Sequence, residues 1–456
     1  MKLFRSIQRA RGAAAAVGAA LLLLTTSAHA DFVNGGFEQS PDFTGWTTPG
    51  FAIPGGIPTF PPTQWSHLGL TTGTSQSAVQ NGPGNAAATD GNLTWTNRVA
   101  RVHDENNGNN YTASAIAQVL TVAAGDIEAD GKVHIRFNAA PVLEDPGHAP
   151  DEQPYFFIEV TNQHGTSLYH TFNYANEPGV PWVLNSAGSH RYTNWQAFDI
   201  PVTAAVGDQL TLRLLAAGCG QGGHAGALYV NDVRTQAAVQ GPSLWVSAAG
   251  PATICLNRGG TTNVTYTYTY RNNGTDPMYG VTASVSMPVT SDSTPVTTTF
   301  VSITNPTFGG GTCTAPASPG NPATCSIGTL QPGQQGTFQM TVQIPAGAIG
   351  PTLNNGTYSL SGATSAQGGT VVTQLGPLVR TAMSENCAVN VAPVPTLGEW
   401  AMMLLASLSM RKGPKGELLA AVAVLDELGK IIAAGGLSPA FVTLLNELRH
   451  RLLWLL

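Results

Sequence analysis

The sequence has few charged residues and very little lysine. Only 10% of its 456 residues are Asp, Glu, Lys or Arg, against about 25% in an ordinary soluble domain. Lys132 is the one lysine between residues 31 and 410, a stretch with 10 basic and 22 acidic residues. Proteins that bind nucleic acid use Lys and Arg to displace counterions from the phosphates. The charge balance therefore argues against nucleic acid as a partner.

Motifs of common catalytic sites are also missing. The sequence contains no Gly-x-Ser-x-Gly elbow, no phosphate-binding loop and no His-Glu-x-x-His pattern. Its carboxylate clusters at 104–105, 144–145 and 151–152 lie among Asn, Gly and Pro, which is typical of solvated loops. We therefore predict that the protein is not an enzyme. The alternative is a glycan-active enzyme of the cell envelope that uses a carboxylate pair, although no pair stands out in the sequence. Loss of reducing-sugar release on mutation of Glu144 or Asp151 would favour it.

Residues 1–30 have the pattern of a signal peptide. Basic residues come first, an apolar run follows at 13–24, and Ala28-His29-Ala30 has small residues where signal peptidase cleaves. An N-terminal membrane helix is the alternative, but the apolar run is short for one. We expect export, with Asp31 as the first mature residue.

A second targeting pattern lies near the other end, in residues 394–412. The motif residues are Pro395, Thr396, Leu397, Glu399 and Trp400, followed by an apolar run to Met410 and then by Arg411 and Lys412. This order resembles the IPTL-CTERM sorting signal of Gram-negative bacteria. The resemblance implies contact with the membrane through the C-terminus and processing by a transpeptidase-type membrane enzyme of the exosortase or archaeosortase kind.

Two features depart from that pattern. A helix that spans a bilayer needs about 20 apolar residues, whereas 400–410 supplies 11 before the basic pair. The chain then continues through a tail, 413–456, in which two helices are predicted at 417–434 and 438–456. Several explanations stay open for the tail: interfacial helices, a helical hairpin, a changed reading frame or a fused segment. For 394–412, the alternative is a loop that leads into a buried helix.

Between the two signals the sequence predicts an all-β protein. In residues 31–235, short β-branched or aromatic runs alternate with clusters of Gly, Asn, Asp and Pro, as in β-sandwiches. The opening 32–38 and the closing 227–233 resemble the first and last strands of galactose-binding-like jelly rolls, a superfamily that includes many carbohydrate-binding modules. The resemblance implies a structural calcium ion where these strands meet, with Glu38 and Asp232 as ligands. The alternative is that Glu38 is solvated and Asp232 caps a turn.

Aromatic residues of this first region are candidates for sugar binding, since exposed rings stack on sugar faces. Trp46 and Trp195 lie in strand-like contexts and are expected in the core. Trp65, Trp95 and Trp182 lie in loop-like contexts and are the predicted carbohydrate-binding residues. Extracellular polysaccharide is therefore a predicted partner.

The second region follows a linker at 236–241 and covers residues 242–390. In 262–270 the residues alternate, so that Tyr266, Tyr268 and Tyr270 share one face of a strand. The order of this strand, the Asn-Asn-Gly turn at 272–274 and the later Leu-x-Pro-Gly turn at 330–333 resembles Ig-like conserved-repeat domains. Bacterial surface proteins use such domains as stalks.

The sequence has five cysteines, all but one of them in the second region. Cys313 and Cys325 bracket a loop rich in Pro and Gly, and Cys255 and Cys387 lie near the two ends of the region, so these are the predicted disulfides. Other connectivities stay open. Cys219 is left over as a buried thiol or an intermolecular link.

Taken together, we predict a jelly-roll sandwich followed by an Ig-like β-sandwich and a C-terminal helical sorting segment. The protein would be a non-catalytic matrix or adhesion component at the cell surface, outer envelope or extracellular matrix of a Gram-negative bacterium. Besides the enzyme, the alternative is a structural protein that binds only other protein subunits.

Overall fold

The structure is a computed structural model that describes residues 29–106, 111–237, 241–256, 260–292, 294–348 and 350–385. In these ranges the helical elements are three short 3-10 turns, η1 (Trp65–Leu68), η2 (Ala87–Thr89) and η3 (Ala124–Asp126). No helix in the described part of the chain is long and apolar enough to cross a membrane. Residues 1–28 of the predicted signal peptide, the sorting signal 394–412 and the tail 413–456 lie outside the described residues.

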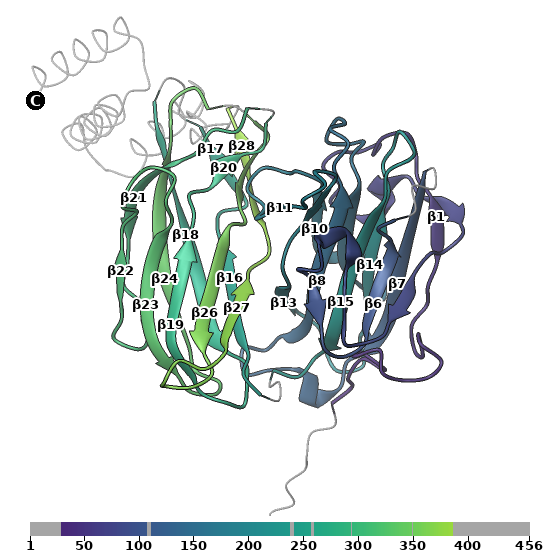
Figure 1. Ribbon diagram of the computed structural model, residues 1–456, viewed down its shortest axis with the longest axis horizontal. Helices are drawn as coiled ribbons and strands as arrows, with labels where there is room; N and C mark the ends of the chain where they lie inside the picture. The colour runs from purple at the N-terminus through teal and green to yellow at the C-terminus, as the bar shows by residue number, and fades with distance from the viewer. Residues whose placement is uncertain are drawn as a thin grey trace, which may run out of the picture. The chain divides into compact units, whose positions relative to one another are not determined.

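The first β-sandwich contains fifteen of the strands, coloured purple to teal in Figure 1. Their bounds are β1 Gly50–Ala52, β2 Thr71–Gly73, β3 Ala78–Gln80, β4 Gly84–Asn85, β5 Thr94–Trp95, β6 Val99–Asp104, β7 Thr112–Thr121, β8 Val133–Glu144, β9 Tyr155–Asn162, β10 Ser167–Tyr174, β11 Val183–Leu184, β12 His190–Tyr192, β13 Gln196–Val202, β14 Gln209–Ala217 and β15 Gly226–Arg234. One layer has the strand order β10-β9-β14-β7-β1-β2, and the facing layer has the order β13-β8-β15-β6-β3.

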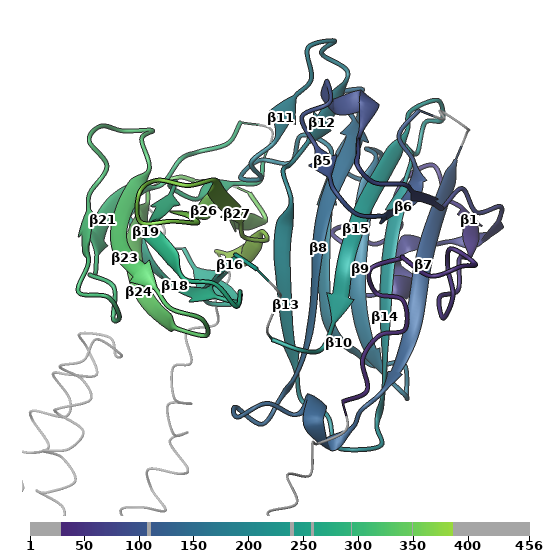
Figure 2. The same ribbon diagram turned by 60° about the horizontal axis from the view of Figure 1, so that its bottom comes forward.

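Alternation along each strand explains the core between these layers. On β14, Leu210, Leu212 and Leu214 are fully buried between the sheets, while Thr211 and Arg213 lie on the opposite, outer face. At one end of the six-stranded sheet the outer face is also apolar, because the segment with Ile53, Ile57 and η1 covers it. The layers can be followed in Figure 2.

The second sandwich contains the remaining strands, drawn in green to yellow in Figure 1. Their bounds are β16 Leu244–Ala249, β17 Thr253–Cys255, β18 Thr262–Asn272, β19 Met278–Val285, β20 Val289–Thr290, β21 Thr299–Ile303, β22 Thr312–Thr314, β23 Ala323–Leu330, β24 Gln335–Ile344, β25 Thr352–Asn355, β26 Tyr358–Ala363, β27 Val371–Leu375 and β28 Val379–Ser384. The strand orders are β22-β23-β19-β26-β27, β16-β18-β24-β21 and a smaller β17-β28-β25-β20. The first of these continues into the β13-β8-β15-β6-β3 layer, because β27 pairs in parallel with β13 at Leu375 and Gln196. The prediction of an all-β fold with two sandwiches is confirmed.

The three alternating tyrosines of β18 face the core of this second sandwich, where each is 0% exposed. A buried phenol needs a hydrogen-bond partner. The hydroxyl of Tyr268 accepts a hydrogen bond from Asn355 Nδ2 at 2.8 Å, and that of Tyr270 donates to the carbonyl of Phe308 at 2.8 Å. The tyrosines therefore tie β18 to elements far away in the sequence.

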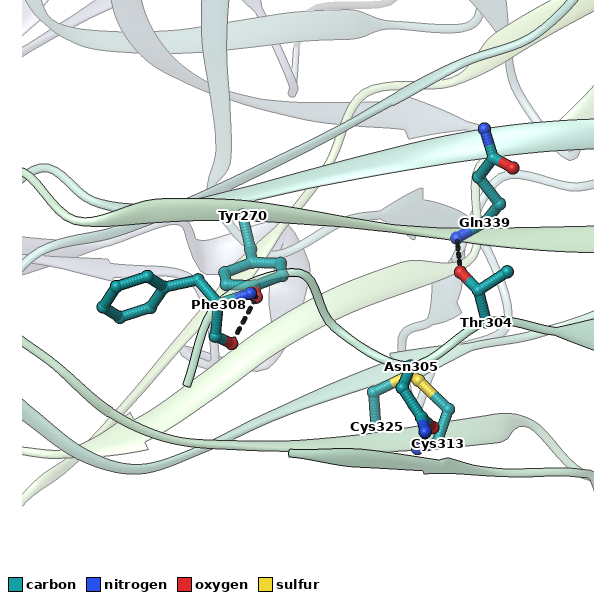
Figure 3. Close-up of a disulfide and its surroundings, with 7 residues drawn as sticks. All are labelled: Tyr270, Thr304, Asn305, Phe308, Cys313, Cys325 and Gln339. Carbon is teal, nitrogen blue, oxygen red and sulfur yellow. Dashed lines mark hydrogen bonds between the residues drawn. A yellow bond between two sulfur atoms is a disulfide. The ribbon is translucent and has the colours of Figure 1, made fainter. Parts of the chain in front are cut away.

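A disulfide joins neighbouring strands at the edge of this sandwich (Figure 3). Cys313 on β22 and Cys325 on β23 are directly opposite each other in the register, and they form the predicted bond. The preceding segment is held by side chains, since Asn305 Oδ1 accepts the amide of Cys313 at 3.0 Å. Cys255 is also disulfide-bonded, and Cys387, its predicted partner, lies outside the described residues. Cys219 is a buried free thiol.

Contacts also join the two sandwiches. The guanidinium of Arg380 on β28 donates to the carboxylate of Glu177, which follows β10, with an Nε to Oε1 distance of 3.0 Å. Glu177 is 2% exposed and also accepts hydrogen bonds from Asn173 and Asn354. A buried carboxylate is stable only with such partners. The ion pair between Arg380 and Glu177 is therefore a structural contact between the two sandwiches.

Candidate functional site

A hollow of about 560 Å³ lies on the outer face of the six-stranded sheet. We call it the Trp65 hollow. It is lined by Val33, Gly45, Thr47, Pro49, Phe51, Trp65, Ala115, Ala117, Gln118, Val119, Thr211 and Arg213. The alanines of β7 form part of its lining, and because their side chains are short, they leave room between the larger groups. The strands that form it are labelled β1, β7 and β14 in Figure 2.

Trp65 is the largest aromatic side chain at this hollow. It begins η1 and is partly buried. Phe51 meets its ring edge-on with a centroid distance of 5.6 Å, and the guanidinium carbon of Arg213 lies 5.5 Å from its centroid. The backbone amide of Trp65 donates to Glu159 Oε1 at 3.2 Å. Packing and hydrogen bonding therefore fix the position of the indole.

An ion pair supports the same site from the neighbouring strands. Arg213 on β14 and Glu159 on β9 are directly opposite in the register, and Arg213 Nη1 donates to Glu159 Oε2 at 3.0 Å. The side chain of Glu159 is 2% exposed, whereas that of Arg213 is 33% exposed. Arginine carries five N–H donors, so its guanidinium can hold the buried carboxylate and still donate hydrogen bonds to a ligand in the hollow.

The other two predicted carbohydrate-binding residues lie elsewhere. Trp95 is only 9% exposed and belongs to the core. It stacks on Tyr229 with a centroid distance of 5.0 Å, and its Nε1 donates to the carbonyl of Asn81. Its ring therefore offers no open face to a sugar, because alternation along β5 points the side chain inward. Trp182 is partly buried and lines a separate hollow. The three tryptophans do not form one common surface.

The expected core tryptophans lie as follows. Trp46 is 7% exposed in the core between the layers. Trp195 is partly buried and packs against the cluster that contains Trp95.

The two predicted calcium ligands both have protein partners. Glu38 is exposed, and its Oε1 accepts the amide of Arg98 at 2.8 Å. Asp232 forms an ion pair with Arg234. Burial raises the pKa of Asp232, and the guanidinium of Arg234 opposes that rise. The calcium site stays a prediction.

Sequence reasoning missed Arg213 and Glu159 as site residues. Each is a lone charged residue inside an apolar strand, Leu-Thr-Leu-Arg-Leu-Leu at 210–215 and Tyr-Phe-Phe-Ile-Glu-Val at 155–160. A charged residue in an apolar strand requires a partner when it is buried, so these two residues could have been predicted to form ion pairs. The partner itself follows only from the register of β9 and β14.

Comparisons with known proteins give one family match and several similar structures. Residues 392–410 match the IPTL-CTERM motif. With this motif the chain is an exported protein of the cell surface of Gram-negative bacteria, and the motif implies processing by a membrane-associated sorting enzyme. No curated protein matches the chain.

Three solved structures are similar to parts of the chain. Caldicellulosiruptor saccharolyticus CBM27-1 in complex with mannohexaose has 16% identity and a TM-score of 0.19, with 35% of this chain and 82% of that chain covered. The C-terminal domain of the Streptococcus agalactiae AgI/II polypeptide BspA has 11% identity and a TM-score of 0.19, with 62% and 99% covered. A calcium-binding mutant of Bacteroides uniformis β-glucuronidase 2 has 9% identity and a TM-score of 0.19, with 67% and 33% covered.

Proposed function

We propose that the protein is a non-catalytic matrix or adhesion component that binds extracellular polysaccharide in the Trp65 hollow. The observation that carries this proposal is the indole of Trp65 with the partly exposed guanidinium of Arg213 over one face of its ring, which leaves the opposite face for a sugar. An aromatic face stacks on the apolar C–H face of a sugar ring. The guanidinium donates hydrogen bonds to the hydroxyl groups of the same ring.

The neighbouring residues support this assignment. Thr211 also lines the hollow, and the side chain of Gln118 shapes its wall while both ends of its amide are hydrogen-bonded to the backbone of Val33. The pairing of Arg213 with Glu159 holds the arginine side chain in place before a ligand arrives. A preordered site loses less conformational entropy on binding. The arrangement therefore suits a neutral sugar, because Glu159 already balances the charge of the arginine.

A glycan array with the full-length protein tests the proposal, followed by calorimetric titration of the best ligand. Trp65→Ala should weaken binding about tenfold, since aromatic stacking contributes roughly 1.5 kcal/mol. Trp245→Ala is the matched control and should bind like the wild type, because Trp245 lies on β16 of the second sandwich and lines a different hollow. If a folded Trp65→Ala protein binds the glycan with unchanged affinity, the sugar does not bind in the Trp65 hollow and the proposal is wrong. Release of reducing sugar from the bound glycan would instead support an enzyme.

A further inference from the structure

Two loops of the first sandwich bring three metal-ligating side chains together. His148 lies between β8 and β9, and Cys219 and His224 lie between β14 and β15. The strand register brings the loops to the same end, because Tyr155 pairs with Ala217 and Leu143 with Gly226. These four strands are labelled in Figure 2.

Backbone hydrogen bonds hold the loops in place. The amide of Gly220 donates to the carbonyl of Glu152 at 2.8 Å and so joins the two loops, and the amide of Cys219 donates to the carbonyl of His224 at 3.1 Å within the second loop. The position of the cluster therefore rests on main-chain geometry as well as on its side chains.

We propose that His148, Cys219 and His224 form a binding site for one transition-metal ion of the zinc and copper class. One ligand atom from each residue lies within 4.8 Å of the other two. Cys219 Sγ and His224 Nδ1 are 3.2 Å apart. Ligand atoms around a tetrahedral zinc ion lie about 3.5 Å apart, given Zn–S and Zn–N bonds of roughly 2.3 and 2.0 Å. Small side-chain rotations would therefore complete the site.

The chemistry of the three groups selects the metal. A thiolate with two imidazoles suits zinc and copper, whereas calcium and magnesium prefer oxygen ligands. Three protein ligands leave a fourth position for water, an arrangement found in catalytic zinc sites, whereas structural zinc sites have four protein ligands.

Buried polar atoms without a partner supply a second, independent observation. The Nε2 atom of His148 is buried and has no hydrogen-bond partner among the described residues. Gln153, which is 4% exposed, donates from its amide to the carbonyl of His148 at 3.3 Å, and its Oε1 has no partner there either. Unpartnered buried polar atoms are rare in folded proteins and call for an explanation. A bound metal ion would satisfy the imidazole.

Catalysis by a cysteine–histidine pair fits the site less well. Such a pair needs a nucleophile that a substrate can reach, and Cys219 is only 1% exposed. The pair would also leave His148 without a role, although its ring lies 5.1 Å from that of His224. A small ion can reach a buried thiol that a carbonyl substrate cannot.

Metal titration of the full-length protein tests the proposal. The protein is purified with a chelator, which is then removed, and no reductant is added, so that the disulfides of Cys313, Cys325 and Cys255 stay closed and supply no thiols. It is titrated with Zn²⁺ or Cu⁺ in excess Ca²⁺, so that the predicted calcium site does not contribute. We expect one equivalent of Zn²⁺ or Cu⁺ to bind and to raise the Tm, because metal binding stabilises the folded state. Co²⁺ should give a thiolate-to-metal charge-transfer band.

Variants test whether the metal ion binds at these three residues or at other side chains. Cys219→Ser should lose the cobalt charge-transfer band, and His148→Gln and His224→Gln should each bind Zn²⁺ at least tenfold more weakly. His164→Gln is the matched control, because His164 is an exposed histidine of the same sandwich. If Cys219→Ser does not fold, the two histidine variants carry the test. Absence of stoichiometric binding to the wild type, or equal binding by the histidine variants and the control, would overturn the proposal.

Discussion

The ion pair between Glu159 and Arg213 allows a quantitative test of how the Trp65 hollow is built. Replacing Arg213 by Met removes the charged partner of a carboxylate that is 2% exposed. Loss of one partner from a fully buried pair costs about 3–5 kcal/mol. Because the Arg213 side chain is 33% exposed, water weakens the attraction in the ion pair and can solvate Glu159 in part when the arginine is removed. We therefore expect Arg213→Met to lower the free energy of unfolding by about 2 kcal/mol.

The matching change on the other strand should be milder. Glu159→Gln removes the charge but keeps an oxygen to accept the amide of Trp65, which now lies 3.2 Å from Glu159 Oε1. We expect it to cost about 1 kcal/mol, close to the value of one hydrogen bond. In the double variant no buried charge remains unpaired, so its cost should fall about 1–2 kcal/mol below the sum of the single costs.

Urea unfolding of the four proteins measures these costs, with unchanged m-values as the sign that stability alone has changed. Arg213→Met should also weaken sugar binding, whereas Glu159→Gln should affect it less. The reasoning is refuted if Arg213→Met unfolds at the wild-type urea concentration. A coupling energy below about 0.3 kcal/mol in the cycle would refute it equally.

Three further results are expected. Burial lowers the pKa of His134, but its hydrogen bond to Asp199 and the charge of that carboxylate outweigh burial, so the net shift of the pKa is upward. The protonated His134 therefore stabilises the folded protein fully below pH 6.5, and this stabilisation is lost as the pH rises from 6.5 through the raised pKa of the folded protein. His134→Gln should remove this loss in thermal unfolding at a series of pH values, and an unchanged pH dependence would show that another group causes it. Replacing both Cys313 and Cys325 by Ser should cost about 3 kcal/mol of unfolding free energy, measured in urea, because the bond restricts the unfolded chain by joining residues 12 positions apart; equal stability of the oxidised wild type and the variant would contradict this. Intact-mass analysis of the protein recovered from cells should show loss of the residues beyond 395–397, and persistence of the chain to Leu456 would contradict sorting.

Local patterns predicted a large part of the fold. The alternation at 262–270 placed three tyrosines on one face, and that face is buried in the second sandwich. The short, Pro- and Gly-rich separation between Cys313 and Cys325 predicted their bond, which the structure contains. Both inferences depend on residues that are close in the chain, for which backbone geometry leaves few arrangements.

The candidate site consists of residues that are far apart in the sequence. Trp65 meets a carboxylate 94 residues away, and that carboxylate pairs with an arginine 54 residues further along. A loop-like context put Trp95 among the exposed rings, although its strand β5 turns it toward Tyr229. Side-chain type alone does not show which face of a sandwich a residue occupies.

The sequence alone was sufficient to predict that the protein is exported, rich in β-strands, poor in charged residues and carries a sorting motif. Each of these properties follows from the composition or from a contiguous stretch of residues. The pairing of β9 with β14, and the meeting of two loops at His148, Cys219 and His224, arose only on folding. Strand register sets which distant side chains share a face, and a shift of one residue would reverse every side chain on a strand.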